Sequence, residues 1–296
     1  MSRTAAETAT QPACWRRAAR AAADFEGLPA PGERVAVTGC GTSWFMALAY
    51  AALREAAGQG ETDAFASSEF PVDRAYDRVV AITRSGTTTE VLELLAALRG
   101  RVPTLALTAD PKTPVRDAAD AVAVLDWADE ESVVQTRFAT SALAFLRAGL
   151  GDVPGLKPVD EAAVDAELAV TEPLPEAALE AEQWTFLGRG WTYGLALEAA
   201  LKMREAAGAW TEAYPAMEYR HGPIAIAAPG RVTWAFGAVP EGLAGDVART
   251  GGTLLSSPLD PMAELIRAQR LAVALAEARG LDPDRPRNLT RSVILG

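Results

Sequence analysis

The sequence is poor in the side chains that bind transition metals or form disulfides. It has one histidine and two cysteines among 296 residues. The cysteines, Cys14 and Cys40, are far from each other and from His221 in the sequence. These counts argue against a zinc site and against a disulfide framework, although they leave open a metal site built from carboxylates alone. We therefore expect no metal and no cofactor.

Positive charge is also scarce. The chain has 28 lysines and arginines against 39 aspartates and glutamates, which gives a net charge of −11 and a pI near 4.8. An excess of negative charge disfavours nucleic acid and anionic membranes as partners. It does not disfavour small phosphorylated ligands, because loop amides and helix N-termini bind phosphate locally.

Long apolar runs are missing as well. Charged residues or glycines interrupt every run before it reaches the length of a membrane span. The first 20 residues lack the apolar core and cleavage site of a signal peptide. We therefore expect a cytoplasmic protein with no membrane partner.

The first half of the sequence alternates between short apolar runs and amphipathic stretches. Strands are predicted over 34–38, 63–66, 78–82, 102–107 and 121–125, with helices over 11–25, 44–57, 90–99 and 132–148. This alternation predicts an α/β fold with a mostly parallel sheet that has helices on both faces. Ligands of such sheets bind at the carboxyl ends of the strands.

The pattern restarts after a segment rich in glycine and proline, 149–158, which we expect to be a linker. The second half predicts helices over 159–182 (interrupted near Pro173 and Pro175), 191–207 and 261–278, strands over 184–187, 232–236 and 253–255, and a turn with a short helix over 212–222. Apolar residues near the end of the proline-broken tail, 282–295, predict that this tail is tied down.

Two pairs of similar motifs recur at a nearly constant offset. Gly39-Cys40-Gly41 resembles Gly188-Arg189-Gly190, and the motif that begins at Arg54 resembles the one that begins at Arg204. A constant offset is typical of a duplicated unit. We therefore predict two α/β domains, 1–155 and 156–296.

Hydroxyl side chains are dense in the segment 83–90, between a predicted strand and a predicted helix. This segment holds four threonines, one serine, one glycine and one arginine. Backbone amides, hydroxyls and the helix dipole would converge there on an anion. The alternative is a capping box from Thr87 to Glu90, and the density of hydroxyls favours phosphate binding. A weaker candidate is the turn that contains Thr42 and Ser43, whose hydroxyls could simply cap a helix.

Three charged residues share one face of the predicted helix 191–207. Glu198, Lys202 and Glu205 are spaced by four and three residues, and alanine and leucine surround them. His221, the only histidine, follows shortly after. A carboxylate, an ammonium and an imidazole in one segment are suited to proton transfer. The alternative is a solvated Glu198–Lys202 pair and a structural histidine.

Together these segments resemble the sugar isomerase (SIS) family, and within it the isomerase half of the glutamine–fructose-6-phosphate amidotransferases. The resemblance spans nearly the whole chain and rests on Cys40-Gly41-Thr42-Ser43, Ser68-Glu69-Phe70, Ser85-Gly86 with Thr88, Leu187-Gly188-Arg189-Gly190, Leu197 to Glu205, Glu212-Ala213-Tyr214, His221-Gly222-Pro223 and Pro286-Arg287-Asn288-Leu289.

The resemblance implies two tandem SIS domains, a homodimer and a phosphorylated sugar as ligand. The positions that match phosphate or sugar contacts of the family are Thr42, Ser43, Thr83, Arg84, Ser85 and Thr88. Glu205 matches the base that moves a proton between C1 and C2, and Lys202 matches a lysine that assists the open-chain sugar. His221 matches a ring-opening histidine supplied by the neighbouring subunit. Glu198 is counted among the sugar-binding residues, with the orientation of Lys202 as its alternative role.

Three departures from the family's pattern affect the expected activity. The glutamine-hydrolysing domain has no counterpart in the sequence, so we expect no production of ammonia from glutamine. Arg84 stands where the family usually has glutamine, which adds a cation near the phosphate. Arg291 replaces a lysine that reaches the sugar; because arginine stays protonated, it can contact an anion or a hydroxyl but cannot form a Schiff base.

The leading hypothesis is an amino-sugar-phosphate deaminase that converts glucosamine 6-phosphate to fructose 6-phosphate and ammonia. A fructosamine-6-phosphate deglycase and a plain aldose–ketose isomerase would use the same residues. The alternative of a different class is a phosphosugar-binding sensor or regulator. A sensor would need the loop around Ser85 but neither Glu205 nor His221.

Overall fold

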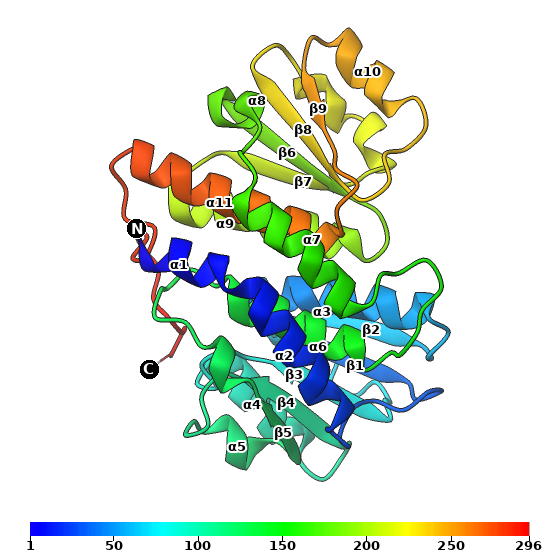
Figure 1. Cartoon of the computed structure of the whole chain (residues 1–296). Helices are drawn as coiled ribbons and strands as arrows, with labels where there is room; N and C mark the ends of the chain where they lie inside the picture. The colour runs from blue at the N-terminus through cyan, green and yellow to red at the C-terminus, as the bar shows by residue number, and fades with distance from the viewer. Residues whose placement is uncertain (296) are drawn as a thin grey trace.

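The computed structural model describes residues 1–295 and contains two parallel sheets (Figure 1). The first sheet has five strands in the order β2-β1-β3-β4-β5. The strands are β1 (Val35–Gly39), β2 (Thr62–Ala66), β3 (Arg78–Ile82), β4 (Thr104–Thr108) and β5 (Ala121–Val124). All five residues of β1 are buried, as expected for a parallel strand with helices on both faces.

The second sheet has four strands in the order β7-β6-β8-β9. They are β6 (Gln183–Gly188), β7 (Thr211–Pro215), β8 (Arg231–Phe236) and β9 (Thr253–Leu255). This order repeats that of the first four strands of the first sheet, and all neighbours are again parallel. The prediction of an α/β fold with parallel sheets flanked by helices is confirmed.

Most of the helices lie between the two sheets (Figure 1). The helices are α1 (Arg3–Ala9), α2 (Gln11–Ala23), α3 (Thr42–Ala56), α4 (Thr89–Leu98), α5 (Val115–Ala118), α6 (Arg137–Ala148), α7 (Val159–Thr171), α8 (Glu176–Glu180), α9 (Thr192–Ala207), α10 (Leu243–Arg249) and α11 (Pro261–Ala278). One hydrophobic cluster runs through this helical layer, from Trp15 and Phe138 to Trp184 and Trp234.

The crossing of α3 and α9 joins the two halves of the chain. Gly194 makes the crossing close, because a Cβ there would lie 2.4 Å from the Phe45 carbonyl oxygen and 2.9 Å from the Ala49 nitrogen. A side chain at this position would push the helices apart. The crossing brings the start of α3, at the edge of the first sheet, against the charged face of α9.

Two predicted segments differ in the structure. The sequence predicted a turn and a short helix over 212–222. This prediction is wrong for residues 212–215, which belong to strand β7. The sequence of β7, Thr-Glu-Ala-Tyr-Pro, lacks an apolar run, and its pairing with β6 supplies the strand. Helix α6 begins at Arg137 rather than 132, because the Glu130 carboxylate accepts the amides of Thr136 and Arg137 and fixes the start. Helices α1 and α10 were not predicted.

The C-terminal tail is tied down, as predicted. Asp284 accepts the amides of Arg3 and Thr4, and the Val293 carbonyl accepts the amide of Thr89. The two termini therefore lie on the same side of the molecule (Figure 1).

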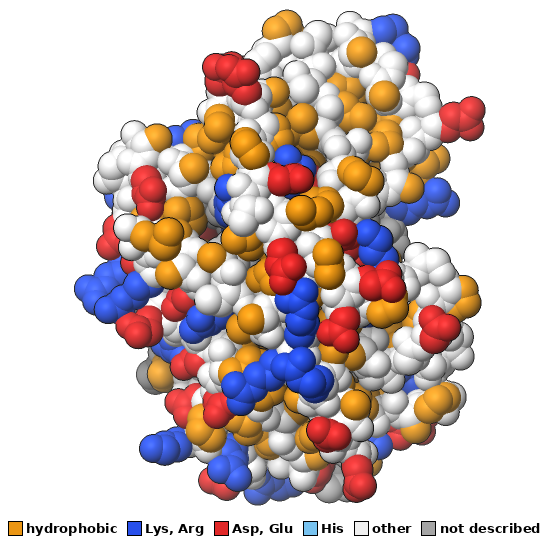
Figure 2. Space-filling model, viewed as in Figure 1, with side chains coloured by type: hydrophobic (Ala, Val, Ile, Leu, Met, Phe, Trp, Pro, Cys, Tyr) orange, Lys and Arg blue, Asp and Glu red, His pale blue; other side chains and the backbone are white. Residues whose placement is uncertain are grey.

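Charges of both signs are interspersed over the face seen in Figure 2, so neither sign dominates it. Within residues 1–295, none of the helices is long and apolar enough to cross a membrane. In the same part of the chain, no group of three or more histidine, cysteine or acidic side chains could hold a metal ion.

Candidate active site

The hydroxyl-rich loop 83–88 joins β3 to α4 at the carboxyl edge of the first sheet. Gly86 makes its sharp turn: its φ is +62°, and a Cβ would lie 2.2 Å from the Thr113 hydroxyl. Thr88 is the N-cap residue of α4 but makes no capping hydrogen bond with its side chain. The Thr87 hydroxyl lies beside Ser85 and Ser292 instead of capping the helix. The capping box considered from the sequence is therefore not formed.

A small cavity of about 30 Å³ lies where this loop meets the β1–α3 turn. Ser43, Thr83, Ser85 and Thr88 line it together with Cys40, Gln135 and others. The Thr83 side chain is 4% exposed, and its hydroxyl has no hydrogen-bond partner within residues 1–295. A buried unpaired hydroxyl costs free energy, and this one belongs to a residue that lines a cavity. Together with Arg84, five of the six predicted phosphate or sugar contacts thus line one cavity.

Arg84 has its guanidinium turned into the protein interior. Its side chain is 1% exposed, and it donates to the carbonyls of Ser132 at 3.0 Å, Val133 at 3.1 Å and Arg291 at 3.1 Å. The Glu130 carboxylate, 0% exposed, lies 3.6 Å away and balances its charge. Arg84 therefore ties the loop 83–88 to the 130–133 segment and to the C-terminal tail.

The charged face of α9 is buried rather than solvated. Lys202 lies between Glu198, at 3.3 Å, and Glu205, to which its ammonium donates. The side chains of Lys202 and Glu198 are 1% and 0% exposed, whereas that of Glu205 is 18% exposed. This burial excludes the solvated-pair alternative.

Thr42 connects this face to the first half of the chain. The Lys202 ammonium donates to the Thr42 hydroxyl at 3.0 Å, and that hydroxyl donates to Glu198 at 3.3 Å. Since Thr42 and Ser43 are consecutive at the start of α3, the hydroxyl-lined cavity and the charged face are neighbours. The helix crossing thus assembles one site from two distant segments.

Burial controls the protonation of this cluster. Desolvation raises the pKa of Glu198 from 4.5 to about 8, against the opposing effect of Lys202. Burial alone would lower the pKa of Lys202, but the neighbouring Glu198 and Glu205 carboxylates outweigh it and the pKa is raised. Glu198 therefore keeps its proton to a higher pH than an ordinary glutamate does, beside the Lys202 ammonium.

A second, larger cleft of about 430 Å³ opens on the other side of Glu205. It lies between the end of α9 and the tail, and its charged lining residues are Arg204, Glu205, Asp282, Arg285 and Arg287. Glu205 therefore contacts Lys202 and is also accessible to solvent through this cleft.

The sequence is similar to those of several curated proteins. The chain is 28% identical to the isomerizing glutamine–fructose-6-phosphate aminotransferase of Gloeobacter violaceus over 88% of its own length and 52% of that protein. It is 31% identical to the corresponding protein of Symbiobacterium thermophilum, over 88% and 51%. The chain therefore spans about half the length of the curated relatives it matches. No family model matches the chain.

Solved structures share the fold. The C-terminal domain of the glucosamine-fructose-6-phosphate aminotransferase of Francisella tularensis covers 97% of this chain, over 98% of its own length, with a TM-score of 0.78 and 20% identity. The chain therefore resembles the sugar isomerase family, and within it the isomerase half of these aminotransferases. A glucosamine-6-phosphate deaminase from Thermotoga maritima also shares this fold, with a TM-score of 0.82 and 24% identity over 99% of this chain and 100% of that one.

Two predicted site residues of this chain stand apart from the cluster. His221 is exposed at the end of the 3₁₀ turn η3 (Glu218–Arg220), and its side chain makes no hydrogen bond within residues 1–295. Arg291 lines the small cavity, but its guanidinium pairs with Asp129 and with the Glu130 carbonyl.

Ser292 and Glu130 were not identified from the sequence. The Ser292 hydroxyl lies 3.1 Å from that of Ser85 and 3.0 Å from that of Thr87, so the tail contacts the hydroxyl-rich loop directly. No local pattern marks a serine in a tail or one acid within Asp129-Glu130-Glu131. Both become significant only through contacts across the fold.

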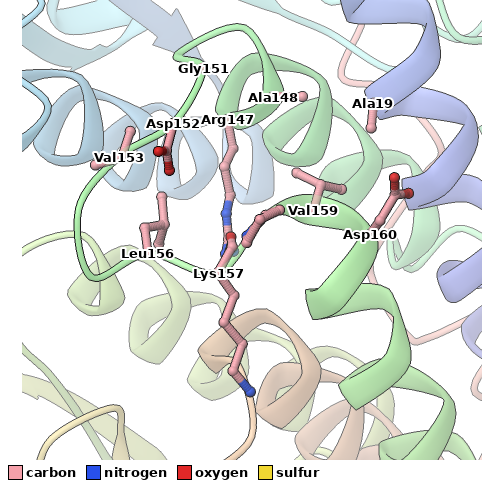
Figure 3. A pocket seen from close by; sticks show the side chains of 11 residues that line it. Ala19, Arg147, Ala148, Gly151, Asp152, Val153, Leu156, Lys157, Val159 and Asp160 are labelled. Carbon is pink, nitrogen blue, oxygen red and sulfur yellow. The ribbon is translucent and has the colours of Figure 1, made fainter.

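Another cavity, of about 510 Å³, lies at the 149–158 segment and is separate from the predicted site residues. Figure 3 shows Arg147 and Lys157 extending across it. Arg147 already forms a buried two-bond pair with Asp260, at 3.0 and 2.7 Å. Its charge is therefore satisfied within the protein.

Proposed function

We propose that this chain is a phosphosugar isomerase that deaminates an amino-sugar phosphate, converting glucosamine 6-phosphate to fructose 6-phosphate and ammonia. We further infer two tandem SIS domains, 1–155 and 156–296. The observation that carries the proposal is the contact of Thr42 with the buried Glu198-Lys202-Glu205 face, beside a cavity lined by hydroxyls.

The phosphate would bind in the small cavity. Hydroxyls of Ser43, Thr83, Ser85 and Thr88 line it, and the N-terminus of α4 adds amide donors and a favourable dipole. Neutral donors of this kind suit a phosphate in a protein of negative net charge. Arg84 would act indirectly, by holding the loop, because its guanidinium is already engaged.

Glu205 would move the proton. In the open-chain amino sugar, its carboxylate takes the C2 proton and the resulting enolamine is protonated at C1, which leaves an imine at C2. Water adds to C2, the C2–N bond breaks, and ammonia leaves, so C1 is reduced and C2 oxidised without an outside oxidant. The Lys202 ammonium would stabilise the negative charge on the sugar oxygens.

His221 would open the sugar ring from the partner subunit of a homodimer. Its exposure and the lack of any side-chain hydrogen bond within residues 1–295 are compatible with a role completed in an assembly. Elsewhere in this half of the chain, the exposed indole of Trp210, at 83% exposure just before β7, is typical of a surface that another chain covers.

The test is an assay with glucosamine 6-phosphate that measures ammonia and fructose 6-phosphate together. We expect equal amounts of the two products, loss of turnover in Glu205→Gln with binding retained, and full activity in the control Glu161→Gln on the exposed face of α7. Retained activity in Glu205→Gln would contradict the assignment of the base. Thermal stabilisation by the sugar phosphate without turnover would favour a phosphosugar sensor.

A further inference from the structure

Helix α1 holds the 130–133 segment through one buried carboxylate. Glu7 is 5% exposed, and one of its oxygens accepts the backbone amides of Glu131, at 2.6 Å, and Ser132, at 3.4 Å. Its other oxygen accepts the Ser132 hydroxyl. Donors that would otherwise be buried without a partner keep such an acceptor, because losing it costs free energy. Glu7 therefore fixes the backbone of this segment.

The same helix also holds the C-terminal tail. The Asp284 carboxylate accepts the amides of Arg3 at 2.9 Å and Thr4 at 2.8 Å, and it accepts the buried Thr4 hydroxyl at 2.7 Å. The Asp284 carbonyl accepts the amide of Val133 at 2.9 Å, which joins the tail to the 130–133 segment directly. Helix α1, the 130–133 segment and the tail are thus connected by hydrogen bonds into one unit.

Arg84 links this unit to the loop 83–88. All three of its carbonyl acceptors lie in the two segments that α1 holds: Ser132, Val133 and Arg291. Arg84 stands between Thr83 and Ser85, which line the small cavity. A shift of the 130–133 segment would therefore move the guanidinium and, with it, the residues on either side.

Water cannot take over these contacts. Arg84 and Ser132 are 2% and 0% exposed, so a guanidinium N–H or an amide that loses its acceptor stays buried and unpaired. Networks of buried hydrogen bonds of this kind hold their members in one arrangement. The loop and the 130–133 segment therefore keep one relative position as long as Glu7 holds the segment.

We propose that Glu7 is a positioning residue of the phosphate site. It fixes the carbonyls that hold Arg84, and through Arg84 it sets the loop 83–88 in the conformation that binds the phosphate of the sugar. This inference rests on the proposed function, which places the phosphate in the cavity of this loop. Glu7 touches no ligand in this assignment and acts only through Arg84.

The experiment measures the affinity for fructose 6-phosphate by calorimetry in a double-mutant cycle of Glu7→Ala and Arg84→Gln. We expect each single variant to weaken binding by about tenfold. The double variant should bind no more weakly than the worse single variant, because both changes break the same linkage. If Glu7 acted independently of Arg84, the two losses would multiply to about a hundredfold. Because binding is measured, the result does not depend on the reaction.

Three further variants separate positioning from stability. Glu7→Gln keeps an acceptor for the two amides, so its affinity should lie within about threefold of the wild type. Arg147→Met breaks a buried pair outside these contacts and should keep wild-type affinity although it lowers stability. Ser132→Ala removes only the hydroxyl that Glu7 accepts. It takes the place of Glu7→Ala in the cycle if a melting curve shows that Glu7→Ala is unfolded, with an expected loss of about threefold.

Wild-type affinity in a folded Glu7→Ala protein, or losses that multiply in the double variant, would overturn the inference while leaving the phosphate site in place. A loss in Glu7→Gln equal to that in Glu7→Ala would overturn it as well. So would an equal loss in Arg147→Met, because the effect would then follow stability. A wild-type protein that binds neither fructose 6-phosphate nor glucosamine 6-phosphate would overturn the inference and the proposed function together.

Discussion

Lys202 gives the most quantitative test of the buried cluster. Its ammonium lies between Glu198 and Glu205 with 1% of the side chain exposed. Removing one member of a buried ion pair costs about 3–5 kcal/mol, because the remaining charge is left without compensation. We therefore expect Lys202→Met to lower the free energy of unfolding by about that amount and Tm by about 10 °C.

The loss should also depend on pH. The pKa of Glu198 is about 8 in the folded state against an ordinary value of 4.5, so the folded state binds this proton more tightly. The stability that this bound proton contributes is complete when the pH is below the ordinary pKa of 4.5, and it is lost as the pH rises through about 8. Without Lys202 the pKa of Glu198 rises further. The variant then keeps a proton that the wild type has released, and its loss of stability should be larger at about pH 9 than at about pH 6.

Urea unfolding followed by tryptophan fluorescence measures both effects, since Trp15, Trp184 and Trp234 are fully buried. The double variant Lys202→Met, Glu198→Gln is the matched control, and we expect it to lose most of the pH dependence. A Lys202→Met protein with wild-type stability, or with a loss that is the same at both pH values, would refute this description of the cluster.

Three further predictions concern single contacts. Thr83→Val removes a buried hydroxyl without a protein partner, so stability should stay the same or rise while affinity for the phosphosugar falls by about tenfold in calorimetry. Gly194→Ala should lower Tm although alanine favours helix by about 1 kcal/mol, because its Cβ would meet the Phe45 carbonyl at 2.4 Å. Arg147→Met should cost about 3–5 kcal/mol in urea unfolding by leaving Asp260 buried and uncompensated.

Each of these predictions has a contradicting outcome. Unchanged phosphosugar affinity in Thr83→Val would mean that the small cavity is not the phosphate site. A Gly194→Ala protein more stable than the wild type would show that α3 and α9 can move apart at little cost in free energy. For Arg147, restoration of stability by a second change, Asp260→Leu, is expected, and its failure would show that the cost comes from packing and not from charge.

The repeating features of the fold were predictable from the sequence because periodicity carries them. Strands such as 78–82 contain a continuous apolar run, here 79–82, and helices such as α11 have a regular apolar face. Strand β7 was not predictable, since its residues have no strand pattern and its pairing with β6 decides the structure. The start of α6 was missed for a similar reason, because the side chain that fixes it, Glu130, comes from outside the helix.

The candidate site was predictable where its residues lie close in sequence. Glu198, Lys202 and Glu205 share one helical face, and that spacing alone placed them together. Their contact with Thr42 depends on the crossing of two helices that are far apart in the chain, so no local pattern reveals it. For Arg84, the sequence predicted the loop correctly but not the direction of the side chain. Its guanidinium donates to the carbonyls of Ser132 and Val133, which lie near it only in the folded chain.

The central claim is that Glu205 transfers a proton between C1 and C2 of a phosphorylated sugar. The most direct measurement is NMR of fructose 6-phosphate and glucosamine 6-phosphate incubated with the protein in deuterated water. We expect deuterium at C1 or C2 with the wild-type protein and none with Glu205→Gln. Exchange at these carbons that persists in Glu205→Gln, or its absence with both sugars in the wild type, would contradict the account.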